Sequence, residues 1–582
     1  MMVQPLPTAV PPISPPDGQP EAAWITRLEM PVLSPHAAAS TGALAGLRFA
    51  VKDNIDVAGV PTTAACAAFT CLPATHAASV HRLLDAGASM VGKTNLDQFA
   101  CGLNGTRSPW GAVPNSFDAR YVSGGSSSGS AYVVATGQVD FALGTDTAGS
   151  GRVPAGLNNI VGIKPSRGLV SAFGVVPAAQ SIDCVSIFAR TVATATKVLQ
   201  VVMGPDARDP YSRALPLATT PLPAGFRFGV PSLLEFFGDA PSQAAFAQSI
   251  EQLQALGGTP VTIDYAPLAA AAALLYESAL VAERYAAVRE FFDAHEAEVI
   301  EPVRGILAAG RNYSAADFVI AQTQLRALGQ RAAAMWKDID VLLVPTAPTH
   351  CTIADMQASP VERNRRMGAY TNFVNLLDFA AISVPSDLLP GGLPFGITLI
   401  GPCGSDFQLA ELGQRYHHAT GLAQGATGEP LPPMATLPVI AAAPSARVAV
   451  VGAHLSGMPL NGQLTERGAR LVAQTQTAAA YRLYALPGTV PPKPGLVRVA
   501  PGEGAAIAIE VWEMPLALYG SFVALIPSPL GIGTLSLADG STVQGFICET
   551  NDLGGAQDIT HFGGWRNYIA SIAAPKSSPA SA

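Results

Sequence analysis

The sequence predicts an α/β protein in which a mixed central sheet is covered by helices, followed by a smaller α+β domain. Up to about residue 421, short apolar runs alternate with amphipathic segments, the pattern of strands and helices in one layered unit. A stretch rich in Pro, Ala, Thr and Gly interrupts this alternation at residues 425–445. Beyond it, short apolar runs alternate with Gly and Pro turns, which is typical of a β-rich domain.

The predicted organisation has five parts. Residues 1–20 are rich in proline and predict a disordered or extended arm, and residues 21–424 form the first domain. Residues 425–445 are a linker, and residues 446–572 form the C-terminal domain. Residues 573–582 are a flexible polar tail. The N-terminus has no basic segment followed by an apolar core, so it does not predict a secretory signal.

Local patterns predict the elements of both domains. Residues 24–33 predict a short helix, and residues 47–53 predict a strand that ends in charged side chains. The further predicted elements are the helix 76–86, the strand 89–93, the helix 131–135, the strands 139–143 and 226–230, the helix 242–257, a long helix 268–294, the strands 341–345 and 396–401, the helix 406–420 stopped by Gly421, and the strand 447–452.

Composition excludes several classes of function. The net charge of −8 argues against nucleic acid as the main partner. No uninterrupted apolar run reaches the ~18 residues that a membrane span requires. Of the seven cysteines, only Cys66 and Cys71 are close, and their spacing is not that of a zinc site. The cysteines therefore predict reduced thiols in a cytoplasmic protein. No metal-ligand cluster is visible in the sequence, and we expect neither a metal nor a cofactor.

The stretch from Tyr121 to Lys164 carries the chemistry. It holds a Gly/Ser loop at residues 124–130 and a second tight loop at residues 144–152, joined by a short helix and a strand. Because a strand-helix-strand unit returns to the same edge of its sheet, the two loops can meet in space. A flexible linker is the alternative, but the interleaved apolar segments argue against it.

The two loops read GGSSSGS and GTDTAGSGRVPA, and GIKP follows them. This pattern resembles the signature of the amidase-signature hydrolases, which use a Ser-Ser-Lys triad. The resemblance implies that Ser150 is the nucleophile, that Ser126 follows a cis peptide bond and relays protons, and that Lys52 is the base. Lys52 would have to be neutral, which requires burial or a nearby positive charge. A surface lysine paired with Asp53 is the alternative.

The same resemblance assigns roles within and around the second loop. The backbone N–H groups of Thr147, Ala148, Gly149 and Ser150 are implied as the oxyanion hole, and Gly124 as part of the substrate site. We expect the oppositely charged side chains at the two ends of the loop, which belong to Asp146 and Arg152, to hold it in shape.

Two further segments resemble allophanate hydrolases. They are Tyr276–Val288, which reads YESALVAERYAAV, and Arg366–Asp378, which reads RMGAYTNFVNLLD. A spacing of eight residues predicts that Tyr276 and Arg284 share one helix face, where they would bind the substrate carboxylate. The alternative is that Arg284 pairs with a neighbouring glutamate, Glu277 or Glu283, on a solvated helix.

The C-terminal region resembles the C-terminal domain of allophanate hydrolases, which has a γ-glutamylcyclotransferase-like fold. The segments that carry this resemblance are VAVVGAHLSGMPLN at 448–461, IEVWEMP at 509–515 and GFICE at 545–549. It implies that this domain promotes decarboxylation of N-carboxycarbamate. His454, in a loop after a strand, is the candidate residue. A structural or dimerising domain is the alternative.

The resemblance as a whole implies hydrolysis of the terminal amide of allophanate to ammonia. An amidase acting on biuret, malonamide or other amides, the amidase component of a tRNA amidotransferase, and a non-catalytic interaction protein are the alternatives. No biotin-carrier AMKM motif occurs, so a separate urea carboxylase or biuret-pathway enzyme would supply allophanate. The sequence does not show which of these two enzymes supplies allophanate. It also leaves open whether the chain forms a homodimer.

Overall fold

The structure is a computed structural model, and it divides into two compact units, residues 1–440 and 441–582. The predicted N-terminal arm and nearly all of the predicted C-terminal tail lie outside the described residues, as does part of the predicted linker. The described residues are 22–34, 41–218, 220–437, 444–500, 502–550 and 553–573.

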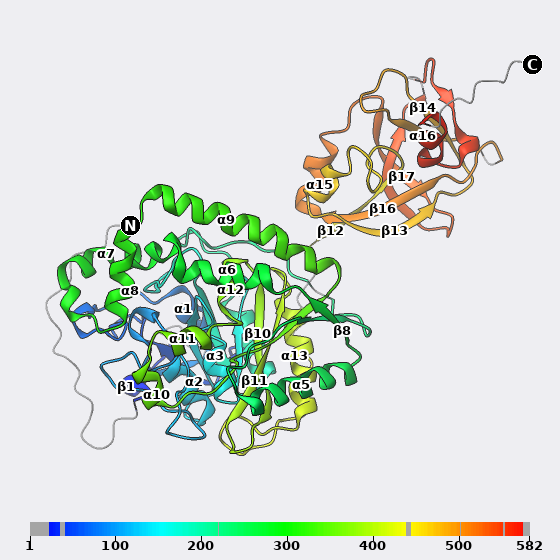
Figure 1. Cartoon of the computed structure of the whole chain (residues 1–582). Coiled ribbons are helices and arrows are strands. Elements are labelled where there is room, and N and C mark those ends of the chain that lie inside the picture. Colours follow the sequence, from blue (N-terminus) through cyan, green and yellow to red (C-terminus); the bar gives the residue numbers. More distant parts are fainter. Residues whose placement is uncertain are drawn as a thin grey trace, which may run out of the picture. The chain divides into compact units, whose positions relative to one another are not determined.

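A mixed sheet runs through the first unit, with helices packed around it (Figure 1). Over the described residues it has eleven strands in the order β1-β3-β2-β4-β6-β5-β10-β11-β9-β7-β8. This confirms the predicted fold class. The strands are β1 (Trp24–Val32), β2 (Arg48–Lys52), β3 (Ser89–Thr94), β4 (Phe141–Asp146), β5 (Val161–Lys164), β6 (Cys184–Ala189), β7 (Arg227–Pro231), β8 (Thr259–Ile263), β9 (Val341–Pro345), β10 (Ala380–Leu388) and β11 (Pro394–Gly401).

Helices pack against this sheet, α2 against β2, β4 and β6, and α13 against β10 and β11. Helix α13 ends where Gly421 adopts a left-handed conformation, as the sequence predicts. The helices are α1 (Ala78–Asp85), α2 (Ser128–Ala135), α3 (Val153–Leu157), α4 (Val192–Val202), α5 (Ala240–Ala255), α6 (Ala266–Glu277), α7 (Ala282–His295), α8 (Val303–Ala309), α9 (Ala315–Ala333), α10 (Ile353–Ala358), α11 (Glu362–Met367), α12 (Asn372–Leu376) and α13 (Asp406–Thr420).

Alternation along β2 decides which way its last residue faces. Phe49 and Val51 lie in the largest apolar cluster, where the ring of Phe49 stacks on that of Phe141 at 5.2 Å. Ala50 instead packs in the cluster that contains the apolar side chains of α2. Since side chains alternate between the faces of a strand, Lys52 points to the same side as Ala50, toward α2.

Two predicted helices were wrong. Residues 24–33 form the edge strand β1, which pairs antiparallel with β3, so backbone pairing with an open edge outweighs the local pattern. The long helix predicted at residues 268–294 is interrupted. Helix α6 ends at Glu277, Ser278 is extended, and its hydroxyl accepts the N–H of Leu280. Such a local hydrogen bond competes with the helix and ends it.

The second unit has its own apolar core and, over its described residues, a five-stranded sheet in the order β13-β16-β12-β18-β17. This agrees with the predicted smaller α+β domain. Its elements are β12 (Ser445–Val450), α14 (Gly462–Thr465), β13 (Arg470–Gln476), β14 (Tyr481–Ala485), β15 (Pro494–Arg498), β16 (Ala508–Pro515), α15 (Leu516–Val523), β17 (Leu530–Ser536), β18 (Thr542–Cys548), β19 (Gln557–Asp558) and α16 (Trp565–Ala573).

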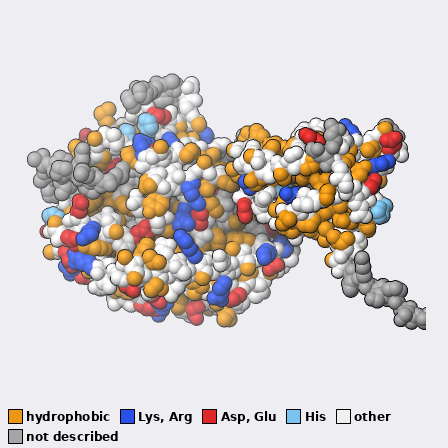
Figure 2. Space-filling model, turned by 90° about the horizontal axis from the view of Figure 1, so that it is seen from above, with side chains coloured by type: hydrophobic (Ala, Val, Ile, Leu, Met, Phe, Trp, Pro, Cys, Tyr) orange, Lys and Arg blue, Asp and Glu red, His pale blue; other side chains and the backbone are white. Residues whose placement is uncertain are grey.

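Charged side chains of both signs are mixed on the surface of the first unit. Figure 2 shows acidic and basic side chains interspersed over the face that it presents. No single helix in the described ranges is long and apolar enough to cross a membrane. Two helical segments joined by a bend, 266–277 and 279–298, together have the length and apolar composition of a membrane span, by these two criteria only.

A buried ion pair supports the strands that precede the site. Lys93 Nζ lies 3.1 Å from Asp53 Oδ1, and both side chains are fully buried. Lys93 also donates to Thr62 Oγ1 at 2.9 Å, and Asp53 accepts the N–H of Thr63 at 2.9 Å. The pair therefore ties the ends of β2 and β3 to the loop at 62–63.

We expect Lys93→Met to lower the free energy of unfolding of the first unit by about 3–5 kcal/mol, because it leaves the Asp53 carboxylate buried without its cation. Urea denaturation followed by fluorescence measures this change. Arg365→Ala, which breaks an exposed pair with Glu362, is the control and should cause no comparable loss. Equal effects of the two substitutions would contradict the structural role of the buried pair.

Candidate active site

The candidate site lies where three parallel strands end. β3, β2 and β4 are neighbours and run parallel, so their carboxyl ends meet at one edge of the sheet. Lys52 is the last residue of β2, Asp97 follows β3, and the loop 147–152 follows β4. Sheets of this kind bind ligands at the carboxyl ends of their strands, which favours this edge as the site of chemistry.

Lys52 is fully buried and held by two hydroxyl groups. Its Nζ donates to Ser126 Oγ at 2.8 Å and to Thr145 Oγ1 at 2.6 Å. Burial lowers the pKa of Lys52 to about 7, although nearby carboxylates, among them Asp97, oppose the shift. The alternative of a surface lysine paired with Asp53 is wrong, since Asp53 pairs with Lys93.

Ser126 stands just before α2, and the Gly125–Ser126 peptide bond is cis. A side chain at Gly125 would place its Cβ 2.3 Å from Asp97 Oδ2, so only glycine fits. The buried Asp97 carboxylate accepts hydrogen bonds from three backbone N–H groups of residues 104–107 and so anchors that segment beside Gly125. Asp97 was not among the predicted site residues, because no sequence motif marks it.

The second serine loop is held by its two charged ends, as predicted. Arg152 Nε and Nη2 each lie 2.9 Å from a carboxylate oxygen of Asp146, and both side chains are fully buried. Burial raises the pKa of Asp146, but Arg152 and hydrogen bonds from Gly149 and Gly151 more than offset this, so its net pKa is below the ordinary value. The carboxylate therefore stays ionised and keeps the loop closed.

The segment 366–378 braces this loop. Thr371 Oγ1 donates to Ala148 O at 2.7 Å, and Asn375 Nδ2 donates to Asp146 O at 2.7 Å. Gly149 has a φ of +128°, and a Cβ there would lie 2.3 Å from Thr371 Oγ1. The resemblance of this segment to allophanate hydrolases did not predict that Thr371 and Asn375 support the nucleophile loop.

Ser150 is almost fully buried, and its Oγ donates to Gly102 O at 3.4 Å. Within the described residues no hydrogen bond joins Ser126 to Ser150. The structure thus brings Lys52 and Ser126 into contact and places Ser150 in the neighbouring loop. A relay between the two serines requires Ser150 to leave Gly102.

Of the four N–H groups predicted for the oxyanion hole, that of Gly149 is already used, because it donates to Asp146 Oδ1 at 2.9 Å. The hydrogen bonds of the described residues show no acceptor for the N–H groups of Thr147, Ala148 and Ser150. These three N–H groups are thus not used by the described part of the chain.

Tyr276 and Arg284 lie together, but on different helices, because α6 ends between them. Arg284 Nη2 lies 3.4 Å from the Tyr276 hydroxyl, and its guanidinium stands over the Tyr276 ring at 5.2 Å. Arg284 is 3% exposed, and its Nε and Nη1 have no partner in the described part of the chain. Glu283 instead accepts two hydrogen bonds from Ser181, so the alternative of an Arg–Glu pair on a solvated helix is wrong.

Asp183, just before β6, is a partly buried carboxylate that was not predicted from the sequence. It accepts the Thr147 hydroxyl at 2.5 Å and the N–H groups of Ala178 and Ala179 at 2.8 and 3.1 Å. Burial raises its pKa to about 6. Its charge opposes the burial that lowers the pKa of Lys52, and the charge of Arg284 opposes the burial that raises the pKa of Asp183.

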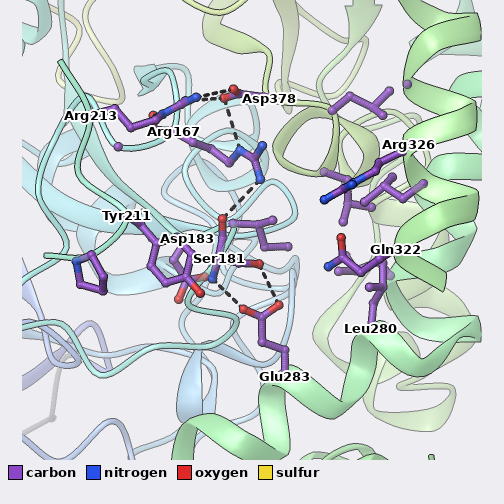
Figure 3. Close-up of a pocket in the computed structure, with 18 residues that line it drawn as sticks. Arg167, Ser181, Asp183, Tyr211, Arg213, Leu280, Glu283, Gln322, Arg326 and Asp378 are labelled. Atoms are coloured by element: carbon purple, nitrogen blue, oxygen red, sulfur yellow. Dashed lines mark hydrogen bonds and ion pairs between the residues drawn. The ribbon is translucent and has the colours of Figure 1, made fainter. Parts of the chain in front are cut away.

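A cavity of about 510 Å³ adjoins this region (Figure 3). Asp183 and Leu280 line it, and Arg167 and Arg213 meet Asp378 at its side. Neither Lys52 nor Ser150 lines it. An apolar cluster that includes Ala148, Ile182, Leu275 and Leu280 packs beside the nucleophile loop, so the cavity lies next to the catalytic groups and not at them.

Gly124 has a φ of +78°, and a Cβ there would lie 2.9 Å from Pro154 Cα. Close approach to α3 explains this glycine, and its contact with substrate stays a prediction. Among the described residues, no group of three or more His, Cys, Asp or Glu side chains could hold a metal ion.

In the second unit, His454 follows β12 in a loop, as predicted. Its Nε2 lies 2.9 Å from Gln463 Oε1, and its ring stacks on Phe546 at 5.0 Å. Burial lowers its pKa, so the imidazole is neutral near neutral pH. It lines a cavity of about 210 Å³ with Lys493 and several apolar side chains.

Two family models match the chain, one in each unit. The Amidase family model matches residues 32–410, and the model of the allophanate hydrolase C-terminal domain matches residues 446–570. The chain belongs to the amidase family.

Among its relatives, the urea amidolyases of Lachancea kluyveri and Saccharomyces cerevisiae are 45% and 43% identical over 90% of this chain. The chain spans only 30% of the length of either. The solved allophanate hydrolase of Kluyveromyces lactis is 41% identical, with a TM-score of 0.71, over 95% of this chain and 94% of that one. One component of the glutamyl-tRNA(Gln) amidotransferase of a Synechococcus species is 34% identical over 67% of this chain and 87% of its own length.

Proposed function

We propose that the chain is an allophanate hydrolase that releases ammonia from the terminal amide of allophanate and forms N-carboxycarbamate. The observation that carries this proposal is the buried Arg284, whose Nε and Nη1 have no partner among the described residues. A buried guanidinium with unused donors calls for an anionic ligand, and its fork fits a planar carboxylate. The similarity to the K. lactis allophanate hydrolase supports the same substrate.

Arg284 also belongs to the neighbourhood of the nucleophile. Its charge acts on Asp183 and on Cys101. Asp183 holds Thr147, three residues before Ser150, and the carbonyl of Gly102, next to Cys101, accepts the Ser150 hydroxyl. A carboxylate on Arg284 and the Tyr276 hydroxyl would therefore leave the rest of a small substrate beside the second serine loop.

In the proposed mechanism, neutral Lys52 takes the proton of Ser126 as Ser126 takes that of Ser150. Ser150 Oγ then attacks the amide carbonyl and forms a tetrahedral oxyanion. Collapse of this intermediate breaks the C–N bond, and the relay returns a proton through Ser126 to the departing ammonia. Water hydrolyses the acyl-enzyme by the same relay and restores the Ser150 hydroxyl.

The oxyanion hole is assigned to the unused N–H groups of Thr147, Ala148 and Ser150. Gly149, which was also predicted as a donor, contributes the turn, since its own N–H donates to Asp146. Backbone donors fixed in this way stabilise the developing charge without reorganisation.

The C-terminal unit is assigned the decarboxylation of N-carboxycarbamate, with His454 as the candidate residue. Its loop and its cavity belong to a different unit from the hydrolytic site, and the family model of this domain supports the assignment. A structural or dimerising unit remains the alternative, and the cyclotransferase-like fold and a homodimer stay predictions.

The rival functions differ at specific points. A general, biuret or malonamide amidase would not need a buried Arg284 whose Nε and Nη1 have no partner among the described residues. The amidotransferase component matches only 67% of the chain. A non-catalytic interaction protein would not need a buried Lys52 bonded to Ser126. Under this proposal a separate enzyme, a urea carboxylase or one that degrades biuret, supplies allophanate in the cytoplasm.

We expect Ser150→Ala to reduce ammonia release from allophanate on the order of 10⁴-fold or more, because the nucleophile is lost. Ammonia release from allophanate, biuret and malonamide, measured side by side, tests both the residue and the substrate. Ser116→Ala is a matched control, since its buried hydroxyl has no partner within the described ranges. Turnover retained by Ser150→Ala would refute the nucleophile, and a preference for biuret or malonamide would refute the substrate.

The rate should depend on pH through Lys52. A base with its pKa lowered to about 7 is neutral above that pH and protonated below it, so kcat/KM should fall as the pH decreases through about 7. Lys52→Arg stays charged and should be inactive at every pH. A profile that is flat between about pH 5.5 and pH 8 would contradict Lys52 as the base.

Arg284→Ala should raise KM for allophanate about 100-fold, because a hydrogen-bonded ion pair with the carboxylate is lost. The KM for a neutral amide should change far less, so the comparison isolates the carboxylate. Arg289→Ala removes an exposed arginine of the same helix and is the control. Equal changes for both substrates would disprove the carboxylate role.

His454→Asn should leave the first release of ammonia intact and slow the release of carbon dioxide, so that N-carboxycarbamate accumulates. Carbon-13 NMR of labelled allophanate follows both steps. His561→Asn changes an exposed histidine of the same unit and serves as control. Unchanged decarboxylation in His454→Asn would favour a structural unit.

A further inference from the structure

We infer that Asp183 is a positioning residue of the hydrolytic site: its carboxylate fixes the oxyanion loop through Thr147, and its charge balances the two buried cations Lys52 and Arg284. The inference rests on the function proposed above and adds a residue that neither the sequence motifs nor the family match singles out.

The orientation of the Asp183 carboxylate is fixed by its contacts. One oxygen accepts the Thr147 hydroxyl at 2.5 Å, and the other accepts the N–H groups of Ala178 and Ala179 at 2.8 and 3.1 Å. Asn375 Nδ2 donates both to Ile182 O at 3.0 Å and to Asp146 O at 2.7 Å, so the segment before β6 is bound to the end of β4. Asp183 therefore sits on a rigid support.

Thr147 depends on this support. The rest of the oxyanion loop is held elsewhere: Asp146 binds the N–H groups of Gly149 and Gly151, and Thr371 binds the carbonyl of Ala148. At Thr147 the hydrogen bond from the side chain to Asp183 holds the loop. Since Thr147 carries one of the three N–H groups assigned to the oxyanion, a shift of this residue would weaken stabilisation of the transition state.

Charge gives Asp183 its second role. The charges that act on Lys52 are those of Asp97, Asp183 and Asp146. Asp146 is paired with Arg152, and Asp97 is bound by backbone N–H groups. Asp183 acts on Lys52 and is itself acted on by Arg284.

Two charged side chains near Asp183 form their hydrogen bonds with Ser181 and not with Asp183. Glu283 and Arg167 both turn to Ser181, two residues away, where Glu283 accepts the N–H and hydroxyl and Arg167 donates to the carbonyl (Figure 3). Asp183 therefore interacts electrostatically with both the base, Lys52, and the proposed substrate-binding cation, Arg284. Burial raises the pKa of its carboxyl to about 6, so it is ionised at the pH where a neutral Lys52 is present.

The experiment compares Asp183→Asn with Thr147→Val and Thr147→Ser. Thr147→Val removes the hydrogen bond and keeps the charge, so kcat should fall about tenfold or more, with little change in KM and in the midpoint of the acid limb of kcat/KM. Thr147→Ser restores the hydroxyl and should restore kcat. Asp183→Asn removes the charge that raises the pKa of Lys52, so the acid limb should move to lower pH by about 0.5–1 unit.

The carboxamide introduced by Asp183→Asn cannot accept hydrogen bonds at both positions, so the melting temperature of each variant is measured as well. Full activity of Thr147→Val, no rescue by Thr147→Ser, or an unmoved acid limb in folded Asp183→Asn would each overturn the inference. The rate at which a fluorophosphonate labels Ser150, followed by intact mass against pH, reports the activation of the serine without allophanate. If wild type is labelled with the expected acid limb but does not hydrolyse allophanate, the proposed substrate fails and the Asp183 inference is judged on the labelling profiles.

Discussion

Burial of the Lys52 ammonium group beside the Ser126 hydroxyl is the constraint on which the site depends. A cation in a fully buried position loses its hydration, and this lowers its pKa far enough for a neutral amine to exist near neutral pH. Two neighbouring hydroxyl groups replace water as hydrogen-bond partners. The surrounding carboxylates, held by Arg152, by backbone N–H groups or by Thr147, work against the shift, so the final pKa is a balance between desolvation and attraction.

The sheet produces this burial. Alternation along β2 directs Lys52 toward α2, and the parallel course of β2, β3 and β4 brings three loops to one edge. Glycines then allow the backbone to approach closely: Gly125 backs onto Asp97, and Gly149 onto Thr371. The geometry of the two serine loops is thus imposed by packing from several directions.

Local patterns in the sequence were sufficient to predict several strands and helices and the two serine loops. The strands around residues 47–53 and 341–345, the helix 406–420 and the two serine loops follow from short-range periodicity and from the amidase motif. Thr371 and Asn375 could not be predicted, because their partners in the serine loop are more than 200 residues away in the sequence. Asp97 and Asp183 could not be predicted either, because no local pattern marks a carboxylate that accepts hydrogen bonds from backbone N–H groups. The helix predicted at residues 24–33 was wrong for a related reason, since pairing with β3 decides their conformation.

The interruption at Ser278 has a consequence for how specificity can change. Had residues 268–294 formed one helix, Tyr276 and Arg284 would be fixed relative to each other by helical geometry alone. Instead the turn at 279–281 sets their separation, and neither residue belongs to the segments that carry Lys52, Ser126 and Ser150. Recognition and bond cleavage are therefore built on pieces of the chain that are distant in sequence. Substitutions in the turn could retune which carboxylate or amide is accepted while the proton relay is left as it is.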